Sequence, residues 1–146
     1  MLAAMSTPRD PSPTEITLHS ASRLLEIAFD DGRVFKLPFE YLRVYSPSAE
    51  VRGHGPGEET LQLGKRDVTI TELVPVGHYA VQPVFSDGHQ SGIYSWQYLY
   101  GLGVDQEQLW AEYLQKLEVV GGSRDPADPR NAAIMAPEMH SGGGHH

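Results

Sequence analysis

The fold that this sequence predicts is decided by VQPVFSDGHQSGIYSWQYLY, residues 81–100. Residues 80–85 are rich in types that suit a half-buried strand, and Ser86-Asp87-Gly88 supplies the chemistry of a tight turn. Ser95 then stands where a helix N-cap would, and Gly101 can end that helix as a left-handed residue. We therefore predict a strand, a turn, a second strand and a short helix within this stretch.

A second stretch nearer the N-terminus repeats this order. Residues 24–29 and 33–37 read as strands around a turn, and a short helix at 39–43 follows Pro38. The matching segments are Phe29-Asp30-Asp31-Gly32 with Phe85-Ser86-Asp87-Gly88, and Glu40-Tyr41-Leu42 with Gln97-Tyr98-Leu99. An internal duplication and the convergent use of one strand-turn-strand-helix order both explain this match, and the sequence leaves both open.

The remaining elements complete an α+β domain. Short apolar runs predict strands near residues 16–19, 60–63 and 68–74. A helix is predicted from about Gln106 to Glu118, because Asp105 and Gln108 form a capping-box pattern. Its apolar face holds Leu109, Trp110, Tyr113, Leu114 and Leu117. The predicted fold is α+β: antiparallel β-hairpins form a twisted sheet or two small sheets, and this C-terminal amphipathic helix packs on a face.

The length of the chain suits one domain with tails. With 146 residues and 40% hydrophobic content, the chain can bury a single core. Prolines among polar residues predict a disordered arm at residues 1–14, and glycines, prolines and histidines predict a disordered tail at residues 121–146. The single domain is thus predicted over residues 15–120, with a long loop at residues 45–57.

Composition narrows the class of function. The formal net charge of −8 disfavours a nucleic-acid binder, because phosphate backbones are held by an excess of Lys and Arg. The absence of cysteine removes disulfides, thiolate metal ligands and Cys nucleophiles. No signal peptide or membrane-spanning stretch is recognisable, so we predict a cytoplasmic protein that binds neither nucleic acid nor membrane. The oligomeric state is left open.

Two of the seven histidines are candidate metal ligands. His54 lies in a glycine-rich loop, and His89 follows the turn that contains Asp87. Two imidazoles and one carboxylate can bind zinc or iron, although no HxD or HxxxH spacing supports such a site and a turn histidine commonly has no ligand. Three further histidines lie in the predicted tail, where they lack the rigid neighbours that fix a metal geometry.

A small basic cluster is the other candidate site. Arg43 and Arg52 flank a loop whose backbone N–H groups can bind a carboxylate, a phosphate or the acidic segment of a partner. Lys65 and Arg66 add to this cluster. The alternative is that these residues are scattered solubilising charges. No GxSxG elbow, P-loop pattern or carboxylate pair predicts a catalytic residue.

Several separated segments resemble a known family. They are Tyr41-Leu42-Arg43, residues 46–55 (SPSAEVRGHG), residues 85–89 (FSDGH), residues 91–96 (SGIYSW) and Tyr98-Leu99. In this order they resemble the small stand-alone bacterial proteins of the DUF971 family, also called the gamma-butyrobetaine hydroxylase-like N-terminal domain. The resemblance extends over roughly residues 15–118.

The resemblance also has implications for metal binding and catalysis. In larger hydroxylases the related domain precedes an iron- and 2-oxoglutarate-dependent catalytic domain. It binds a structural zinc through cysteines after a Leu-Arg pair and one downstream histidine. His89 corresponds to that histidine, whereas Ser46, Ser48 and Val51 occupy the cysteine region, which implies a degenerate zinc site. The catalytic domain has no counterpart here, so the resemblance does not imply hydroxylase activity.

Related domains are also fused to P-loop proteins implicated in iron–sulfur cluster assembly, which implies an accessory role. We therefore expect a non-catalytic binding or accessory module, with a protein partner in cofactor or iron–sulfur metabolism and no cofactor of its own. The expected binding residues are Arg43, Arg52, His54, Asp87 and His89. The alternative is a protein, including an enzyme, that binds zinc, iron or a small anion near His54 and His89. The missing cysteines favour the first expectation.

Overall fold

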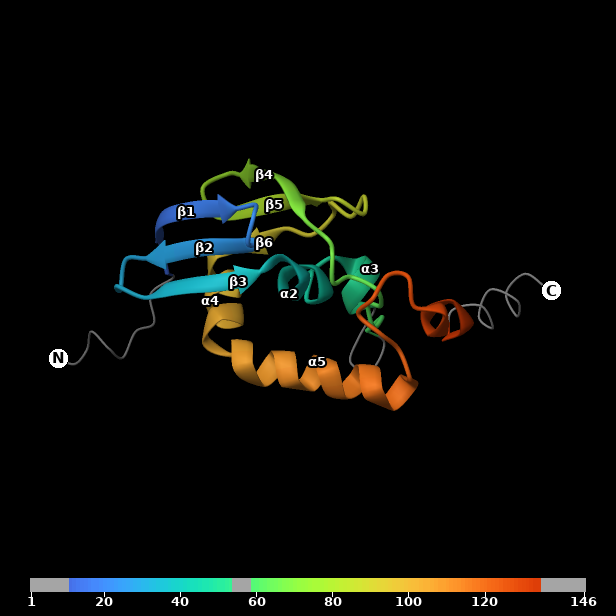
Figure 1. Ribbon diagram of the computed structural model, residues 1–146. Coiled ribbons are helices and arrows are strands. Elements are labelled where there is room, and N and C mark those ends of the chain that lie inside the picture. The colour runs from blue at the N-terminus through green and yellow to red at the C-terminus, as the bar shows by residue number, and fades with distance from the viewer. Residues whose placement is uncertain (1–10, 54–58, 135–146) are drawn as a thin grey trace.

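Two three-stranded antiparallel sheets form the framework of the chain in the computed structural model, which describes residues 11–53 and 59–134 (Figure 1). The first sheet has the order β1-β2-β3, with β1 at Pro13–His19, β2 at Leu24–Phe29 and β3 at Val34–Pro38. The second has the order β4-β5-β6, with β4 at Ile70–Val76, β5 at Ala80–Phe85 and β6 at Tyr94–Ser95. The sheets and the helices that follow them confirm the predicted α+β class with two small sheets.

Helices follow each sheet. They are α2 (Phe39–Val44), α3 (Ala49–Arg52), α4 (Trp96–Val104) and α5 (Gln106–Val120). α5 lies along the lower edge of Figure 1 and contacts the rest of the domain through Leu109, Trp110, Tyr113 and Leu117, as its amphipathic pattern predicts. None of the helices in the described ranges is long and apolar enough to cross a membrane.

The ends of α4 and α5 depart from the prediction. Ser95 caps α4 as predicted, because its Oγ accepts a hydrogen bond from Tyr98 N at 3.0 Å. Gly101 does not end α4, which continues beyond it and thereby buries Leu102. Asp105 precedes α5 without a side-chain cap, so the predicted capping box is wrong.

The second sheet also differs from the prediction. β5 pairs mainly with β4, and β6 adds only the short segment Tyr94–Ser95 to its other edge. The hairpin predicted in residues 81–95 therefore has a long connection in place of a full return strand. Residues 60–63 form no strand. Leu61 and Leu63 instead pack on the side of α5 that carries Tyr113.

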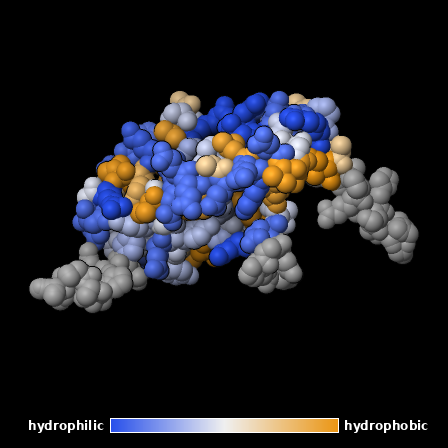
Figure 2. All heavy atoms as spheres, turned by 90° about the horizontal axis from the view of Figure 1, so that it is seen from below, coloured by the Kyte–Doolittle hydropathy of each residue, from blue (hydrophilic) through white to orange (hydrophobic). Residues whose placement is uncertain are grey.

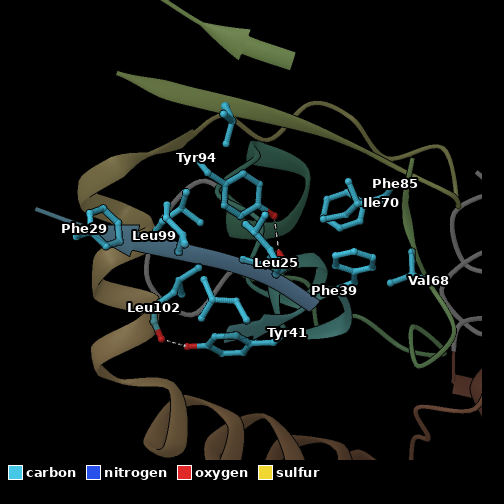
Figure 3. Close-up of a cluster of buried hydrophobic side chains, with 14 residues drawn as sticks. Leu25, Phe29, Phe39, Tyr41, Val68, Ile70, Phe85, Tyr94, Leu99 and Leu102 are labelled. Carbon is cyan, nitrogen blue, oxygen red and sulfur yellow. Dashed lines mark hydrogen bonds between the residues drawn. The ribbon is translucent and has the colours of Figure 1, made fainter. Parts of the chain in front are cut away.

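Side chains from both sheets and from α2 and α4 form one core (Figure 3). Tyr41 and Tyr94 lie inside it, and their hydroxyls donate to the carbonyls of Leu102 and Leu42, respectively. Both carbonyls belong to the last turn of a helix, where backbone acceptors lack an intrahelical partner. Each tyrosine therefore joins a helix end to the core, and burying a side chain of this size contributes roughly 1.5–3 kcal/mol.

Residues 121–134 lie against the domain, although the sequence assigns them to the predicted tail. The carbonyls of Ser123 and Arg124 accept from Gly64 N and Arg66 N at 2.9 and 3.0 Å. The guanidinium of Arg124 bonds both oxygens of the buried Glu40, at 2.8 and 2.7 Å. The part of the chain that packs on the domain therefore includes residues 121–134. Residues 135–146, the first ten residues and the segment that contains His54 lie outside the described ranges.

Candidate functional site

A buried polar corner forms where the turn after β5 meets the end of α2. One oxygen of Asp87 accepts from Arg43 Nε at 2.9 Å and from Lys65 Nζ at 2.7 Å. The other oxygen accepts from the backbone N–H of His89 at 3.2 Å. The Arg43 side chain is 8% exposed, so its charge is neutralised inside the protein. We define the polar corner as the buried Arg43, Ser46 and His89 together with Asp87 and Glu50, whose side chains are 25% and 71% exposed.

Asp87 is held in its charged form. Burial alone would raise the pKa of its carboxyl. The hydrogen bonds from Lys65 and from the His89 backbone, together with the charge of Arg43, outweigh burial and lower the pKa to about 2. The carboxylate is therefore ionised at neutral pH, which suits an anchor for two cations and not a proton donor.

His89 is enclosed, and both of its ring nitrogens have partners. Ser46 Oγ lies 2.8 Å from Nε2, and Glu50 Oε1 lies 3.2 Å from Nδ1. Because a carboxylate only accepts hydrogen bonds, Nδ1 of the neutral ring carries the proton and Nε2 accepts from Ser46. Burial, and after it the charge of Arg43, lower the pKa of His89 against the opposing effects of Glu50 and Asp87, which favours the neutral ring.

Ser46, His89 and Glu50 follow one another as a nucleophile, a base and an acid would, with a hydrogen bond between Ser46 and His89 and an ion-pair contact between His89 and the exposed Glu50. A nucleophilic serine must be accessible to a substrate, and Ser46 is not. Ser46 is 1% exposed, and its Oγ also accepts from Ser48 N at 3.2 Å. Gly92 lies so close that a Cβ there would be 2.4 Å from this oxygen. A substrate carbonyl has no room at the hydroxyl, so we interpret the polar corner as a structural unit.

The positions that the resemblance relates to zinc lie in and beside the polar corner. Ser48 Oγ bonds Ser91 Oγ at 2.7 Å, and the Val51 side chain is buried. Neutral hydroxyls and an isopropyl group are not zinc ligands, and both nitrogens of His89 already have protein partners. These residues therefore do not fit the metal. Among the residues that the structure describes, no three His, Cys, Asp or Glu side chains form a potential metal site.

An open cleft of about 340 Å³ lies between α3, α4 and α5. Its lining combines tyrosine rings, aliphatic side chains, two cations and the acidic Glu59, and includes Val51, Arg52, Leu61, Tyr98, Tyr113 and Lys116. The guanidinium carbon of Arg52 lies 5.8 Å from the centre of the Tyr98 ring. The cleft thus places an exposed positive charge beside an aromatic and aliphatic surface.

The structure brings together Arg43, Asp87 and His89, three of the five binding residues that the sequence predicts. Arg52 lies apart from them in the cleft, and His54 lies outside the described residues. Sequence reasoning did not identify the partners of His89, Ser46 and Glu50, as site residues. The available signal was the turn former Ser48, whose side chain caps α3 by accepting from Glu50 N.

This fold and site define a class of protein, a small α+β domain with a buried polar corner between a strand turn and a short helix. The family model for the gamma-butyrobetaine hydroxylase-like N-terminal domain matches residues 16–100, and the chain belongs to this family. The matched range contains the whole polar corner and Arg52. The family identified by resemblance is therefore confirmed.

Solved structures agree with this assignment. Two proteins with NMR solution structures are 45% and 49% identical to this chain, with TM-scores of 0.72 and 0.70. Each match covers 82% of this chain, and 94% and 91% of the respective relatives. A DUF971 family protein of unknown function from Acidithiobacillus ferrooxidans is 43% identical, with a TM-score of 0.54 over 63% of this chain and 92% of its own. No curated protein matches the chain.

Proposed function

We propose that this domain is a non-catalytic interaction module that binds a protein partner through the cleft at Arg52. The observation that carries this proposal is the contrast between the two regions of the site. In the polar corner the buried charge of Arg43 is paired with Asp87, whereas the cleft is open and combines aromatic rings with Arg52 and Lys116, beside one carboxylate, Glu59. Protein interfaces concentrate their binding energy in such aromatic and Arg side chains.

The chemistry of the cleft suits a partner segment that carries a carboxylate next to an apolar side chain. Val51 and Leu61 supply apolar surface, and Arg52 holds its guanidinium over Tyr98. A guanidinium that stacks on a ring still has N–H donors at its edge, which a carboxylate accepts in pairs. A Glu or Asp of the partner, beside a Leu or Phe, would satisfy both parts of the cleft.

We further propose that the partner belongs to cofactor or iron–sulfur metabolism in the bacterial cytoplasm. The support is the resemblance to domains fused to P-loop proteins implicated in cluster assembly. Because the chain has no cysteine, it would contact the protein that holds a cluster and would not ligate the cluster through thiolates.

Charge reversal in the cleft tests the proposal. The full-length protein and its Arg52→Glu plus Lys116→Glu variant are used to capture proteins from a bacterial lysate, and each captured protein is quantified by mass spectrometry. The matched control is Arg33→Glu plus Arg130→Glu, which makes the same charge change at exposed residues outside the cleft. We expect the cleft variant to retain at least about tenfold less partner than wild type and control, since a lost hydrogen bond to a charged group costs roughly 1.5–3 kcal/mol.

Equal capture by the cleft variant and the wild type contradicts this proposal. A similar loss in the control variant also contradicts it, because the effect would then come from net charge and not from the cleft. Thermal melting followed by circular dichroism verifies that both variants are folded.

A further inference from the structure

The two turns that match in sequence also match in their hydrogen bonds. In each turn the phenylalanine N–H donates to the carbonyl of the residue four positions on, at 2.9 Å for Phe29 and 3.0 Å for Phe85. The glycine N–H donates back to the phenylalanine carbonyl, at 3.0 Å in both turns. These glycines, Gly32 and Gly88, have φ angles of 91° and 92°. The same turn conformation is therefore used twice.

The first strand of each sheet has the same irregularity. β1 and β4 each shift register against the next strand, at Thr14 in β1 and at Thr71 in β4. Both threonines donate their Oγ1 to a carbonyl of the neighbouring strand, at 3.3 and 3.2 Å. A register shift is a specific feature of a strand, and general strand pairing does not explain its recurrence at the same place.

The repeated unit is three strands and a helix. The first unit is β1-β2-β3-α2, and the second is β4-β5-β6-α4. The helix of each begins after the same backbone contact, because Phe39 N donates to Arg23 O at 3.0 Å and Trp96 N donates to Tyr79 O at 3.1 Å. The correspondence thus runs from the first strand of each unit into its helix.

Contacts between the units are reciprocal. Tyr41 of the first unit donates to Leu102 O at 2.6 Å, and Tyr98 of the second donates to Tyr45 O at 2.6 Å (the first of these bonds is drawn in Figure 3). The interval in sequence from Tyr41 to Tyr98 equals the interval from Tyr45 to Leu102. Each unit therefore makes the contact that it also receives, as expected at an interface with twofold symmetry.

Each turn also meets the helix of the other unit through an aspartate. Asp87 of the second turn accepts from Arg43 of α2, and Asp31 of the first turn accepts from the hydroxyl of Tyr100 of α4. The aspartates also accept from the backbone N–H two residues on, at 3.2 Å for Asp87 and 2.9 Å for Asp31. The polar corner therefore has a counterpart, which we call the aromatic corner: Phe29, Asp31, Phe35, Tyr100 and Gly103.

A ring packs on the turn phenylalanine at both corners. Phe35 lies 5.9 Å from Phe29 between ring centres, and His89 lies 6.1 Å from Phe85. In the aromatic corner this ring also contacts the ring of Tyr100, with centres 5.4 Å apart. In the polar corner the ring is an imidazole, which brings two nitrogen atoms that must be hydrogen-bonded when buried.

A close approach by a glycine also recurs. A Cβ at Gly103 would lie 2.3 Å from the Phe35 ring, and a Cβ at Gly92 would lie 2.4 Å from Ser46 Oγ. The interval from Phe35 to Gly92 equals the interval from Ser46 to Gly103. In the aromatic corner the strand carries the large residue, Phe35, and the helix carries glycine. In the polar corner the position equivalent to Phe35 is Gly92, and the position equivalent to Gly103 is Ser46. The contact between the two equivalent positions is kept.

We propose that the domain is a fused pair of equivalent βββα units, and that the polar corner is a packing unit that needs no metal, like the aromatic corner. Of the two explanations for the sequence match, this supports internal duplication. His89 stands at the turn position of Arg33 and supplies the ring that packs on Phe85, a contact that Phe35 makes to Phe29 from the following strand. Ser46 Oγ and the exposed Glu50 carboxylate lie beside its two ring nitrogens. The polar side chains around His89, which do not fit zinc, then serve to hydrogen-bond a packed imidazole. In the aromatic corner the ring on the turn phenylalanine is Phe35, which needs no hydrogen-bond partner. This proposal does not depend on the cleft.

A double-mutant cycle at Ser46 and His89 tests this proposal on the full-length protein. His89→Phe or Ser46→Ala alone leaves a buried polar atom without a partner, and we expect each to lower Tm by about 5–10 °C. Ser46→Ala combined with His89→Phe makes both partners apolar, and we expect it to recover most of that loss. The control His19→Phe, at a half-exposed histidine paired with Glu26, should leave Tm nearly unchanged.

Two outcomes would overturn the proposal. The first is a combined variant whose loss of Tm equals or exceeds the sum of the single losses, because the two residues would then not form one packing unit. The second is a wild-type Tm that falls with EDTA, is restored by zinc and no longer responds in His89→Phe, because a metal would then close the corner. The metal measurement is repeated with the histidines at 140, 145 and 146 changed to alanine, which separates the corner from metal bound by these histidines.

Discussion

The carboxylate of Asp87 joins two cations from separate parts of the chain, Arg43 and Lys65. Its pKa of about 2, below the ordinary value of 3.8, means that the folded protein binds this proton less tightly than the unfolded chain does. Such a depressed pKa stabilises the fold at neutral pH by about 1–2 kcal/mol, since solvent screens part of the interaction of this partly exposed carboxylate. This stabilisation is present above the unfolded pKa and is lost as the pH falls from about 4 to 2.

We therefore expect Asp87→Asn to lower the free energy of unfolding by about 1–2 kcal/mol at pH 7. The difference from wild type should shrink as the pH approaches 2, because the wild-type carboxyl then becomes neutral as well. Urea denaturation at several pH values measures both effects. Asp31→Asn, at the equivalent but exposed position, is the matched control and should have a smaller effect. A difference between Asp87→Asn and wild type that does not change with pH would contradict this explanation.

At the scale of residues, the sequence predicts which residues belong to the site better than it predicts which side chains they contact. Turn chemistry and charge identified Asp87, Arg43 and His89, and the structure brings these three together. The contacts of His89 with Ser46 and Glu50 join positions that are distant in the chain, and no periodic pattern links such positions. The interpretation of Arg43 as a surface cation missed its burial, because burial depends on the turn after β5, which covers it.

At the scale of elements, the two glycines of α4 provide a matched test. Glycine in a helix is normally destabilising relative to alanine by about 0.5–1 kcal/mol. A Cβ at Gly101 would have nothing within 4 Å, whereas a Cβ at Gly103 would lie 2.3 Å from the Phe35 ring. We expect Gly101→Ala to raise Tm by a few degrees and Gly103→Ala to lower it, since overpacking costs roughly 1–3 kcal/mol. Equal shifts of Tm for the two variants would be inconsistent with the contact between α4 and β3.

The strength of local sequence signals explains which elements the sequence could predict. The turn of β2 and β3, the start of α4 at Ser95 and the body of α5 follow from local signals, and all are present. The end of α4 does not follow from such signals, because Gly101 reads as a C-cap while the burial of Leu102 keeps the chain helical. Residues 60–63 have a strand composition, but their leucines face α5 and find no strand partner.

At the scale of the whole molecule, the segment at residues 121–134 pairs with the buried carboxylate of Glu40, in addition to its backbone hydrogen bonds to Gly64 and Arg66. Arg124 bonds both oxygens of Glu40, and its guanidinium lies 5.2 Å from the centre of the Trp110 ring. Arg124→Ala would leave the Glu40 carboxylate buried without its partner. We expect a loss of about 1–3 kcal/mol in the free energy of unfolding, measured by urea denaturation. A change in the tryptophan fluorescence of the folded protein should accompany it.

The matched control is Arg130→Ala, which removes an exposed arginine paired with Asp128. Exposed ion pairs contribute little, so the stability should remain unchanged. If both variants have the same stability as wild type, the segment does not stabilise the domain. Composition predicts disorder here because prolines and glycines are frequent, and no local signal reveals that Glu40 needs a cation.

The surface in Figure 2 shows apolar patches scattered among polar ones on the face seen from below. The exposed valines at the end of α5, Val119 and Val120, and the partly exposed Leu114 account for the apolar surface of that helix. The sequence assigned Leu114 to the packed face, and the structure leaves it 40% exposed, because the core side of α5 is narrower than the predicted stripe. The interior contacts of α5 therefore rest on Leu109, Trp110, Tyr113 and Leu117.

One turn of helix, α3, has consequences for the evolution of this domain. It carries Glu50 to the polar corner and Arg52 to the cleft, with Val51 buried between them. A substitution at position 46 or 89 that shifts this turn would also move Arg52. The buried corner and the surface of the cleft are therefore not free to vary independently. We expect positions 46, 50, 52 and 89 to covary among related sequences, although Arg52 does not touch His89.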